Sequence, residues 1–193
     1  MDSSGNGIFN IACIGEVMVE LAIQNGNHAI IGTAGDTYNT AVYLKKLDHN
    51  AELKVDYITS LGNDAFSDRI LTELKTHNIG SEFITMRDGM MPGLYAISTD
   101  AEGERSFSYW RGQSAARTLI AEPSNITVEN LSTFDLVYLS GISMAILPQD
   151  ARTQVIKCIK GFRNRGGKLA FDSNYRSRLW EDLETARKCM MDM

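Results

Sequence analysis

Residues 136–172 read LVYLSGISMAILPQDARTQVIKCIKGFRNRGGKLAFD, and this stretch indicates how the chain folds. Leu136–Ser140 and Lys168–Asp172 are short apolar runs that predict two buried strands. Between them, apolar residues recur at helical spacing over 149–165, which predicts an amphipathic helix. Two strands joined by a helix favour a right-handed crossover within a parallel sheet, with helices packed on both faces.

The sequence before this unit repeats the alternation. Strands are predicted over 11–19 (IACIGEVMV) and 55–61, helices over 37–47 and 65–77, and a short strand or turn over 28–34. Asp36 and Thr37 are expected to cap the first of these helices, and a last amphipathic helix is expected over 179–193. The carboxyl ends of parallel strands share one edge of the sheet, and we expect ligands to bind there.

Residues 81–111 break the alternation. Strand-forming residues over 94–99 and 106–110 flank the turn sequence DAEGE, which predicts a β-hairpin with a three-residue loop over 101–103. Gly103 would take the left-handed position of that loop. The resulting register sets Tyr95 opposite Tyr109 and Ile97 opposite Phe107.

Residues two apart on a strand point the same way, so Arg111 is predicted to share a face with Tyr95 and Tyr109. A cation and two phenols projecting together would suit a binding surface. The alternative is an amphipathic hairpin whose aromatic residues pack on the core.

Two further segments are candidates for chemistry. TAGDTYNTA (33–41) is a turn of small residues that opens a helix, whose free N–H groups and Asn39 amide suit an anionic or polyhydroxy ligand; the alternative is a simple helix cap. FDSNYRSRLW (171–180) starts at the carboxyl end of a strand and gathers several polar groups there; the alternative is a solvated connection.

Composition narrows the class of protein. The chain has 193 residues, 44% hydrophobic and 22% charged, which is typical of a globular domain, and its net charge of −5 disfavours nucleic acid as a partner. No stretch approaches the roughly 18 apolar residues that a membrane span needs. Cys13, Cys158 and Cys189 are too scattered for a disulfide framework or a zinc site, so we expect a cytoplasmic protein with no metal site of its own.

Several motifs together resemble the ribokinase-like (PfkB) carbohydrate kinases. These motifs are GEVMVEL (15–21), AGDTYNTAVYL (34–44), PGLYAISTDAEGERSFSYWR (92–111), LSGISMAIL (139–147) and FDSNYRSRLW (171–180). The YWR end of the hairpin and NYRSRLW are particular to the branch that acts on keto-deoxy sugar acids. The resemblance implies a partial three-layer α/β/α sandwich with a small β-sheet lid formed by about 21–31 and 81–111, and a homodimer that associates through the lid.

The resemblance also implies a reaction and its residues. The enzyme would transfer phosphate from ATP, with Mg²⁺, to the terminal hydroxyl of 2-keto-3-deoxygluconate, and Arg111 would lie beside the carboxylate of this sugar acid. The substrate-binding residues would be Ala34, Gly35, Asp36, Thr37, Tyr38, Tyr95, Tyr109, Arg111 and Arg176. The ATP-binding residues would be Asn174, Tyr175 and Arg176.

One family feature is absent from the sequence. The family's catalytic aspartate lies in a Gly-Ala-Gly-Asp segment at the start of a late helix, and no such segment occurs in these 193 residues, so no catalytic residue is assigned. We therefore expect 1–193 to be the N-terminal part of a single ribokinase-like domain, C-terminally truncated and inactive alone. The alternatives are a catalytically silent sugar-binding or dimerising module, and a kinase of neutral sugars, which Arg111 disfavours.

Overall fold

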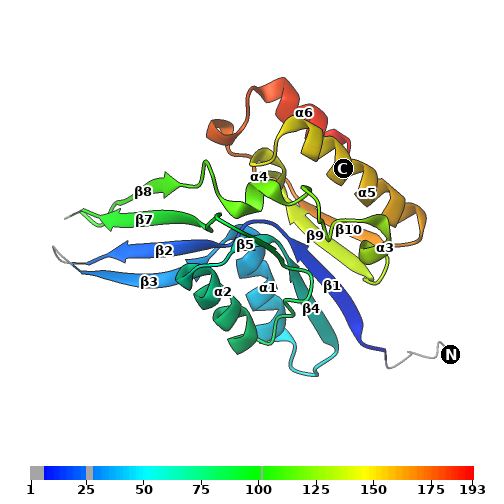
Figure 1. Ribbon diagram of the computed structural model, residues 1–193, viewed down its shortest axis with the longest axis horizontal. Helices are drawn as coiled ribbons and strands as arrows, with labels where there is room; N and C mark the ends of the chain where they lie inside the picture. The colour runs from blue at the N-terminus through cyan, green and yellow to red at the C-terminus, as the bar shows by residue number, and fades with distance from the viewer. Residues whose placement is uncertain (1–6, 25–27, 101) are drawn as a thin grey trace.

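The structure, a computed structural model, describes residues 7–24, 28–100 and 102–193. Its centre is a parallel four-stranded sheet in the order β10-β9-β1-β4 (Figure 1). These strands are β1 (Phe9–Ile14), β4 (Leu53–Ile58), β9 (Leu136–Ser140) and β10 (Lys168–Asp172). The predicted parallel α/β architecture is confirmed.

Helices cover both faces of this sheet. On one side lie α1 (Asp36–Leu47) and α2 (Ala65–Thr76); on the other lie α3 (Val128–Leu131), α4 (Gly141–Ala145), α5 (Gln149–Asn164) and α6 (Leu183–Met191) (Figure 1). Alternate residues of β1 enter two different cores: Ile11 and Cys13 pack with α1 and α2, whereas Ala12 and Ile14 pack with α5 and α6. A strand buried on both faces reads as a continuous apolar run, as residues 11–14 do.

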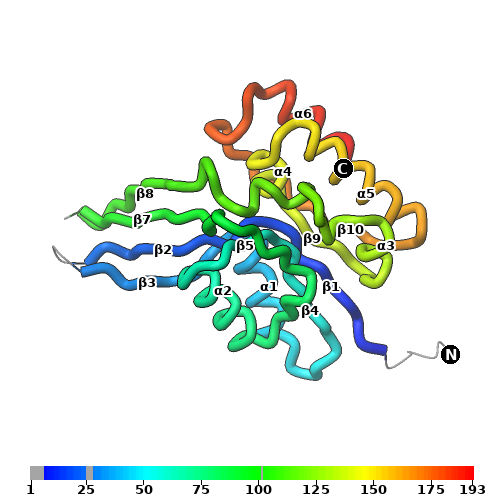
Figure 2. Tube along the Cα trace, in the orientation of Figure 1, coloured from blue at the N-terminus to red at the C-terminus, as the bar shows by residue number. Residues whose placement is uncertain are grey.

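A second sheet, the lid sheet, projects from the edge of the first (Figures 1 and 2). Its strand order is β3-β2-β7-β8, and its strands are β2 (Met18–Ile23), β3 (Ala29–Ala34), β7 (Gly93–Thr99) and β8 (Arg105–Trp110). The predicted hairpin register is confirmed, since Tyr95 pairs with Tyr109 and Ile97 with Phe107. Gly103 has a φ of 86°, as its loop position requires, while Ala101 lies outside the described residues.

The prediction of a single strand over 11–19 is wrong, because the structure has two strands in this region. The chain leaves the central sheet after β1 and enters the lid sheet as β2, as the tube in Figure 2 shows. At the bend, a Cβ on Gly15 would come within 2.3 Å of Thr37 Oγ1 and 2.5 Å of Ser143 Oγ. Every residue from 11 to 19 is buried, so hydrophobicity alone carries no signal of the bend.

The strand predicted over 55–61 also divides. β4 ends at Ile58, and β5 (Ser60–Gly62) pairs with β6 (Thr85–Arg87) in a separate two-stranded sheet. The strands of the lid sheet span 18–34 and 93–110 and overlap the lid segments predicted over about 21–31 and 81–111, while 25–27 lie outside the described residues. That the chain is part of a single domain stays a prediction.

Two helix starts differ from expectation. Gly35, rather than Asp36 or Thr37, is the N-cap of α1, and it offers no side-chain hydrogen bond. The last helix begins at Leu183, after the 3₁₀ turns η1 (Ala115–Thr118) and η2 (Ser177–Leu179) earlier in the chain. Its N-cap is Asp182, whose carboxylate accepts from Thr185 N at 2.6 Å. Among the described residues, no helix has the length and apolarity to cross a bilayer.

Candidate functional site

A cavity of about 230 Å³ lies where the lid sheet meets the carboxyl edge of the central sheet. All three segments singled out from the sequence contribute to it. Its walls are formed by Glu16, Met18, Ala34, Gly35, Asp36, Asn39, Tyr95, Phe107, Tyr109, Arg111, Ile142, Asn174 and Arg176.

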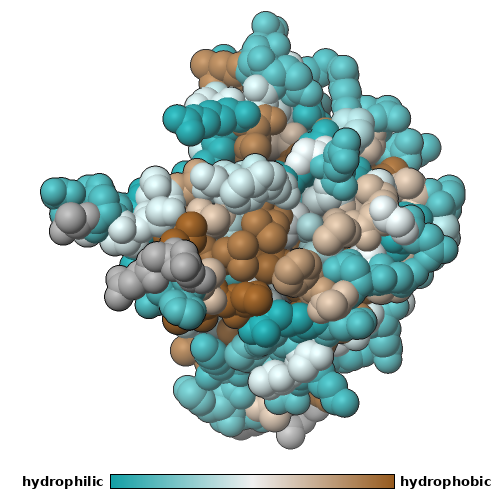
Figure 3. Space-filling view, turned by 60° about the vertical axis from the view of Figure 1, so that its left-hand side comes forward, coloured by the Kyte–Doolittle hydropathy of each residue, from teal (hydrophilic) through white to brown (hydrophobic). Residues whose placement is uncertain are grey.

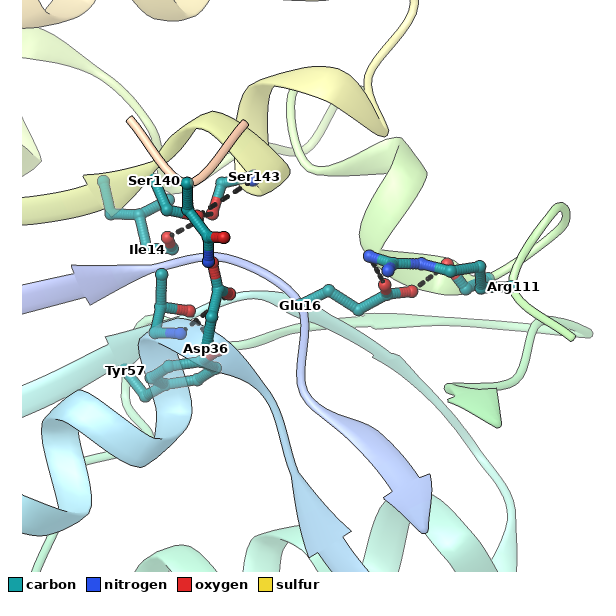
Figure 4. A network of polar contacts seen from close by, with 10 residues as sticks. Ile14, Glu16, Asp36, Tyr57, Arg111, Ser140 and Ser143 are labelled. Atoms are coloured by element: carbon teal, nitrogen blue, oxygen red, sulfur yellow. Dashed lines mark hydrogen bonds and ion pairs between the residues drawn. The ribbon is translucent and has the colours of Figure 1, made fainter. Parts of the chain in front are cut away.

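Asp36 anchors one side of the cavity (Figure 4). Its Oδ2 accepts hydrogen bonds from the hydroxyl of Ser140 and, at 3.3 Å, from Asn174 Nδ2, while its Oδ1 accepts from Thr37 N at 2.8 Å. Ser140 ends β9 and Asn174 follows β10, so the carboxylate ties the start of α1 to two strand ends. A carboxylate held by three donors is a preorganised acceptor for a ligand hydroxyl.

Asn174 adopts a left-handed backbone conformation, with φ of 24°. Asparagine tolerates this region because its short polar side chain bonds locally. Here the backbone N–H of Asn174 donates to Asp172 Oδ1 at 3.0 Å, and its side-chain amide is aimed at Asp36. The turn thereby carries the chain from β10 past the cavity to Arg176.

A buried ion pair forms the opposite side of the cavity. Glu16, which is 2% exposed, pairs with Arg111 and also accepts a hydrogen bond from the hydroxyl of Ser114 (Figure 4). Burial raises the pKa of Glu16 above its ordinary value, although the charge of Arg111 and the Ser114 hydroxyl act to lower it. A Cβ on Gly93 would lie 2.7 Å from Glu16 Oε1, so this glycine leaves room for the carboxylate.

Three aromatic rings of the lid hairpin form a wall beside this pair. The rings of Tyr95 and Tyr109 stack with centroids 5.7 Å apart at 27°, and those of Phe107 and Tyr109 with centroids 6.4 Å apart at 16°. Tyr95 is buried and donates to Glu20, and burial raises its pKa above the ordinary tyrosine value. Tyr109 and Phe107 remain about half exposed, so their apolar faces are free to pack against a ligand.

Some predicted site residues do not reach the cavity. Thr37 is fully buried and its hydroxyl shares a 2.8 Å hydrogen bond with the Tyr57 hydroxyl, while Tyr38 packs edge-on against the same Tyr57 ring at 6.1 Å. Both belong to the buried face of α1 and neither lines the cavity, so their predicted contacts with sugar hydroxyls stay a prediction. Tyr175 is 41% exposed and lies outside the cavity lining.

Other cavity residues were missed by sequence reasoning: Glu16, Met18, Phe107 and Ile142. Phe107 carried a usable signal, since it alternates with Tyr109 along β8. Glu16 carried one as well, because a carboxylate inside a nine-residue buried run needs a partner. That partner, Arg111, is far away in sequence and only the fold brings it near.

No group of three or more His, Cys, Asp or Glu side chains within the described ranges could hold a metal ion. Two arginines of the described residues line the cavity, Arg111 and Arg176. Arg176 is exposed and does not pair with Glu16, so its guanidinium could bind a phosphoryl oxygen.

A parallel α/β sandwich with a β-sheet lid and a small polar cavity at their junction is typical of α/β proteins that bind small ligands at the carboxyl edge of the sheet. Residues 8–193 match the pfkB family of carbohydrate kinases, and the chain belongs to this family.

Relatives support the same grouping. The chain is 44% identical over 185 residues to a 2-dehydro-3-deoxygluconokinase of Dickeya dadantii and 40% identical over 184 residues to one of Haemophilus influenzae. These alignments cover 95% of this chain but 59% of each relative.

Solved structures show the same ribokinase-like fold. A 2-dehydro-3-deoxygluconokinase from Thermotoga maritima superposes with a TM-score of 0.83 at 22% identity, covering 95% of this chain and 56% of its own. A PfkB family carbohydrate kinase from Listeria grayi superposes with a TM-score of 0.82 at 26% identity. The match covers 95% of this chain and 57% of the Listeria chain. A fructokinase from Xylella fastidiosa with bound ATP superposes with a TM-score of 0.76 at 21% identity. The match covers 95% of this chain and 55% of the fructokinase chain.

Proposed function

We propose that the cavity binds 2-keto-3-deoxygluconate and that the complete enzyme phosphorylates this sugar acid with ATP. The γ-phosphoryl group passes from ATP to the terminal hydroxyl oxygen, ADP leaves, and the hydroxyl proton is released. The observation that carries the proposal is a buried guanidinium, Arg111, beside an aromatic wall and a carboxylate acceptor in one cavity of about 230 Å³. Relatives that are 40–44% identical bear the name 2-dehydro-3-deoxygluconokinase.

Each side of the cavity suits one part of this ligand. Asp36 and Asn39, with the backbone of Ala34 and Gly35, would bind hydroxyls. Tyr95 and Tyr109 would pack against the carbon chain. A planar guanidinium binds a carboxylate through two parallel N–H donors, so Arg111 would hold the acid group.

ATP and Mg²⁺ belong to the proposed reaction. Arg176 would contact the transferred phosphoryl group, whereas the Asn174 amide is engaged with Asp36. Mg²⁺ neutralises charge on the phosphates and is usually held by phosphate oxygens and water.

A kinase of neutral sugars is the second candidate, because the chain is also 22% identical to a probable fructokinase-2 of Arabidopsis thaliana. Isothermal titration of the 193-residue chain separates the two. We expect 2-keto-3-deoxygluconate to bind more tightly than fructose and than the analogue whose carboxylate is reduced to an alcohol. Equal affinity for acid and analogue would exclude a carboxylate-reading site, and a chain that binds none of the three would refute the cavity as a sugar site.

We also propose a homodimer that forms through the lid sheet. By strand register, Ile23, Ile31 and Trp110 share the face opposite Tyr95, and they are 44%, 40% and 62% exposed. Figure 3 shows an apolar area on the side of the molecule that the lid occupies. A second copy would bury this area. The cytoplasmic location stays a prediction.

A further inference from the structure

Arg111 is not a free cation waiting for a ligand. Its guanidinium already pairs with Glu16, and both side chains line the cavity (Figure 4). The Glu16 side chain is 1% exposed and that of Arg111 12% exposed, so water screens the pair little. Among the described residues, Arg111 Nε is buried and has no hydrogen-bond acceptor, so the guanidinium retains a donor that no side chain or backbone group satisfies.

A ligand carboxylate on Arg111 would create a charge imbalance. Two carboxylates would then share one guanidinium, and the enclosed group would carry a net charge of −1 instead of zero. Like charges in a desolvated site raise the pKa of one of the two carboxyls. Glu16 is the deeper group, and burial already raises its pKa before any ligand is present.

We propose, building on the sugar-acid site proposed above, that Glu16 is the internal counter-ion of Arg111 that the ligand's carboxylate replaces, and that Glu16 takes up one proton from solvent as the acid binds. Charge then balances, because a Glu16⁻–Arg111⁺ pair becomes neutral Glu16 beside an Arg111⁺–carboxylate pair. Glu16 Oε1 still accepts from the Ser114 hydroxyl after protonation. A neutral sugar brings no negative charge and leaves Glu16 ionised.

Other charged and titratable groups lie around Glu16. Besides Arg111, the charged or titratable side chains that face it are Arg117 of η1, Tyr57 of β4, and the cavity residues Asp36, Tyr95, Tyr109 and Arg176. The guanidinium groups keep their protons throughout the accessible pH range. Burial raises the pKa of Tyr57 and of Tyr95, so these phenols stay protonated as well.

The proposal fixes the sign of the pH dependence. Ligand binding raises the pKa of Glu16, so acid binding is strongest where Glu16 is already protonated and weakens as the pH rises. The loss is at most tenfold in affinity per pH unit, between the pKa of Glu16 without ligand and its pKa with ligand, for a single coupled proton.

Isothermal titration of the 193-residue chain with 2-keto-3-deoxygluconate, repeated in buffers of different ionisation enthalpy from acidic to neutral pH, counts the protons. We expect proton uptake to approach one proton per ligand at pH values between the pKa of Glu16 without ligand and its pKa with ligand. Uptake should fall outside that pH range. The reduced alcohol analogue should bind with no uptake. Glu16→Gln should bind the acid without uptake and with a flat pH profile, whereas the control Glu184→Gln, an exposed residue of α6 outside the cavity lining, should behave as the wild type does.

Carboxyl ¹³C NMR of the glutamate-labelled wild-type chain tests the same step without any substitution. The Glu16 carboxyl signal should move to the position of a protonated carboxyl when the acid binds. It should keep the position of an ionised carboxylate when the alcohol analogue binds. The role of Glu16 is refuted if the acid binds more tightly than the analogue but without proton uptake. It is also refuted if proton uptake persists in Glu16→Gln. Either result leaves the proposed function intact. An acid that binds no better than the analogue overturns both.

Discussion

The hydroxyl of Ser140 donates a hydrogen bond to the carboxylate of Asp36, although the two residues lie 104 positions apart in the sequence. Ser140 ends β9 and Asp36 begins α1, so one contact fixes a strand end against a helix start at the cavity. The same Ser140 oxygen accepts from Ser143 N at 3.2 Å and caps α4. Ser140 therefore couples the geometry of the cavity to two elements.

Replacing Ser140 by alanine should destabilise the chain. Ser140→Ala removes both the cap of α4 and a donor to Asp36, so we expect a loss of about 1–2 kcal/mol in the free energy of unfolding. Urea denaturation measures it. Ser132→Ala is the matched control, because Ser132 bonds a helical carbonyl at the surface and should change little. Similar losses for both variants would refute a special role of Ser140.

The layered fold and the hairpin register could be predicted because both follow from local patterns. The run LVYLS, the helical spacing of Val155 and Ile159, and the glycine at 103 each specify one element without reference to distant contacts. Convergence of the three candidate segments followed from topology, since parallel strands place their carboxyl ends together. The cavity accordingly contains eight of the predicted site residues: Ala34, Gly35, Asp36, Tyr95, Tyr109, Arg111, Asn174 and Arg176.

The structural features that could not be predicted from the sequence depend on contacts between residues far apart in the chain. At the Gly15 bend, Thr37 of α1 and Ser143 of α4 approach so closely that they leave no room for a Cβ. That Thr37 and Tyr38 lie on the buried face of α1 could not be predicted, because the buried face of a helix depends on which sheet it packs against. The Glu16–Arg111 pair joins the strand end at β1 to the lid hairpin, and no local pattern predicts it.

Gly35 should not tolerate a side chain. Its φ of 176° is open to any residue, but a Cβ there would lie 2.4 Å from the carbonyl oxygen of Glu16. Gly35→Ala must therefore push α1 away from the strand bend, and we expect a loss of about 1–3 kcal/mol in unfolding free energy. Thermal or urea unfolding measures it. Gly112→Ala is the control, since a Cβ there meets nothing within 4 Å, and an equal loss would show that space is not the cause.

Asp56 should destabilise the folded chain at neutral pH. Both of its carboxylate oxygens are buried without a hydrogen bond, its nearest cation is Lys54 Nζ at 3.7 Å, and burial raises its pKa. A folded pKa above the unfolded one means that stability is lost as the pH rises from the unfolded pKa towards the folded one. Asp56→Asn removes that loss, so the variant should gain about 1–3 kcal/mol over wild type at neutral pH.

Urea unfolding at acidic and neutral pH checks this prediction. The gain of Asp56→Asn should shrink at acidic pH, where the wild-type carboxyl is protonated in both states. Asp68→Asn is the control, because Asp68 is exposed on α2. A gain that is independent of pH would contradict ionisation as the cause.

The proposed lid dimer should depend on Trp110. This side chain is 62% exposed on the lid face opposite the cavity, and a tryptophan buried at the centre of an interface usually carries much of its affinity. Trp110→Ser should weaken self-association about tenfold or more in sedimentation equilibrium. Leu183→Ser, which alters a similarly exposed apolar residue on α6, should leave it unchanged. A wild-type chain that stays monomeric at micromolar concentration would refute the dimer.

Arg111 should determine the preference for an acid. Truncating one partner of a buried charge pair costs on the order of 2–5 kcal/mol, so Arg111→Ala should lose this much affinity for 2-keto-3-deoxygluconate in isothermal titration. Arg111→Lys should recover only part, because an ammonium cannot form the two parallel hydrogen bonds of a guanidinium. The alcohol analogue should lose much less. Arg105→Ala, at the start of β8 and outside the cavity lining, should bind as the wild type does.

Arg111→Ala also strands the buried carboxylate of Glu16, and this effect must be separated from ligand recognition. In a Glu16→Gln background no charge is left unpaired when Arg111 is removed, so the remaining difference between the acid and its alcohol analogue measures recognition of the carboxylate alone. We expect that difference to persist in this background and to vanish in the double variant Glu16→Gln/Arg111→Ala. If the acid and the analogue lose affinity equally when Arg111 is removed, Arg111 serves only to join the lid hairpin to Glu16, and the preference for a sugar acid loses its physical basis.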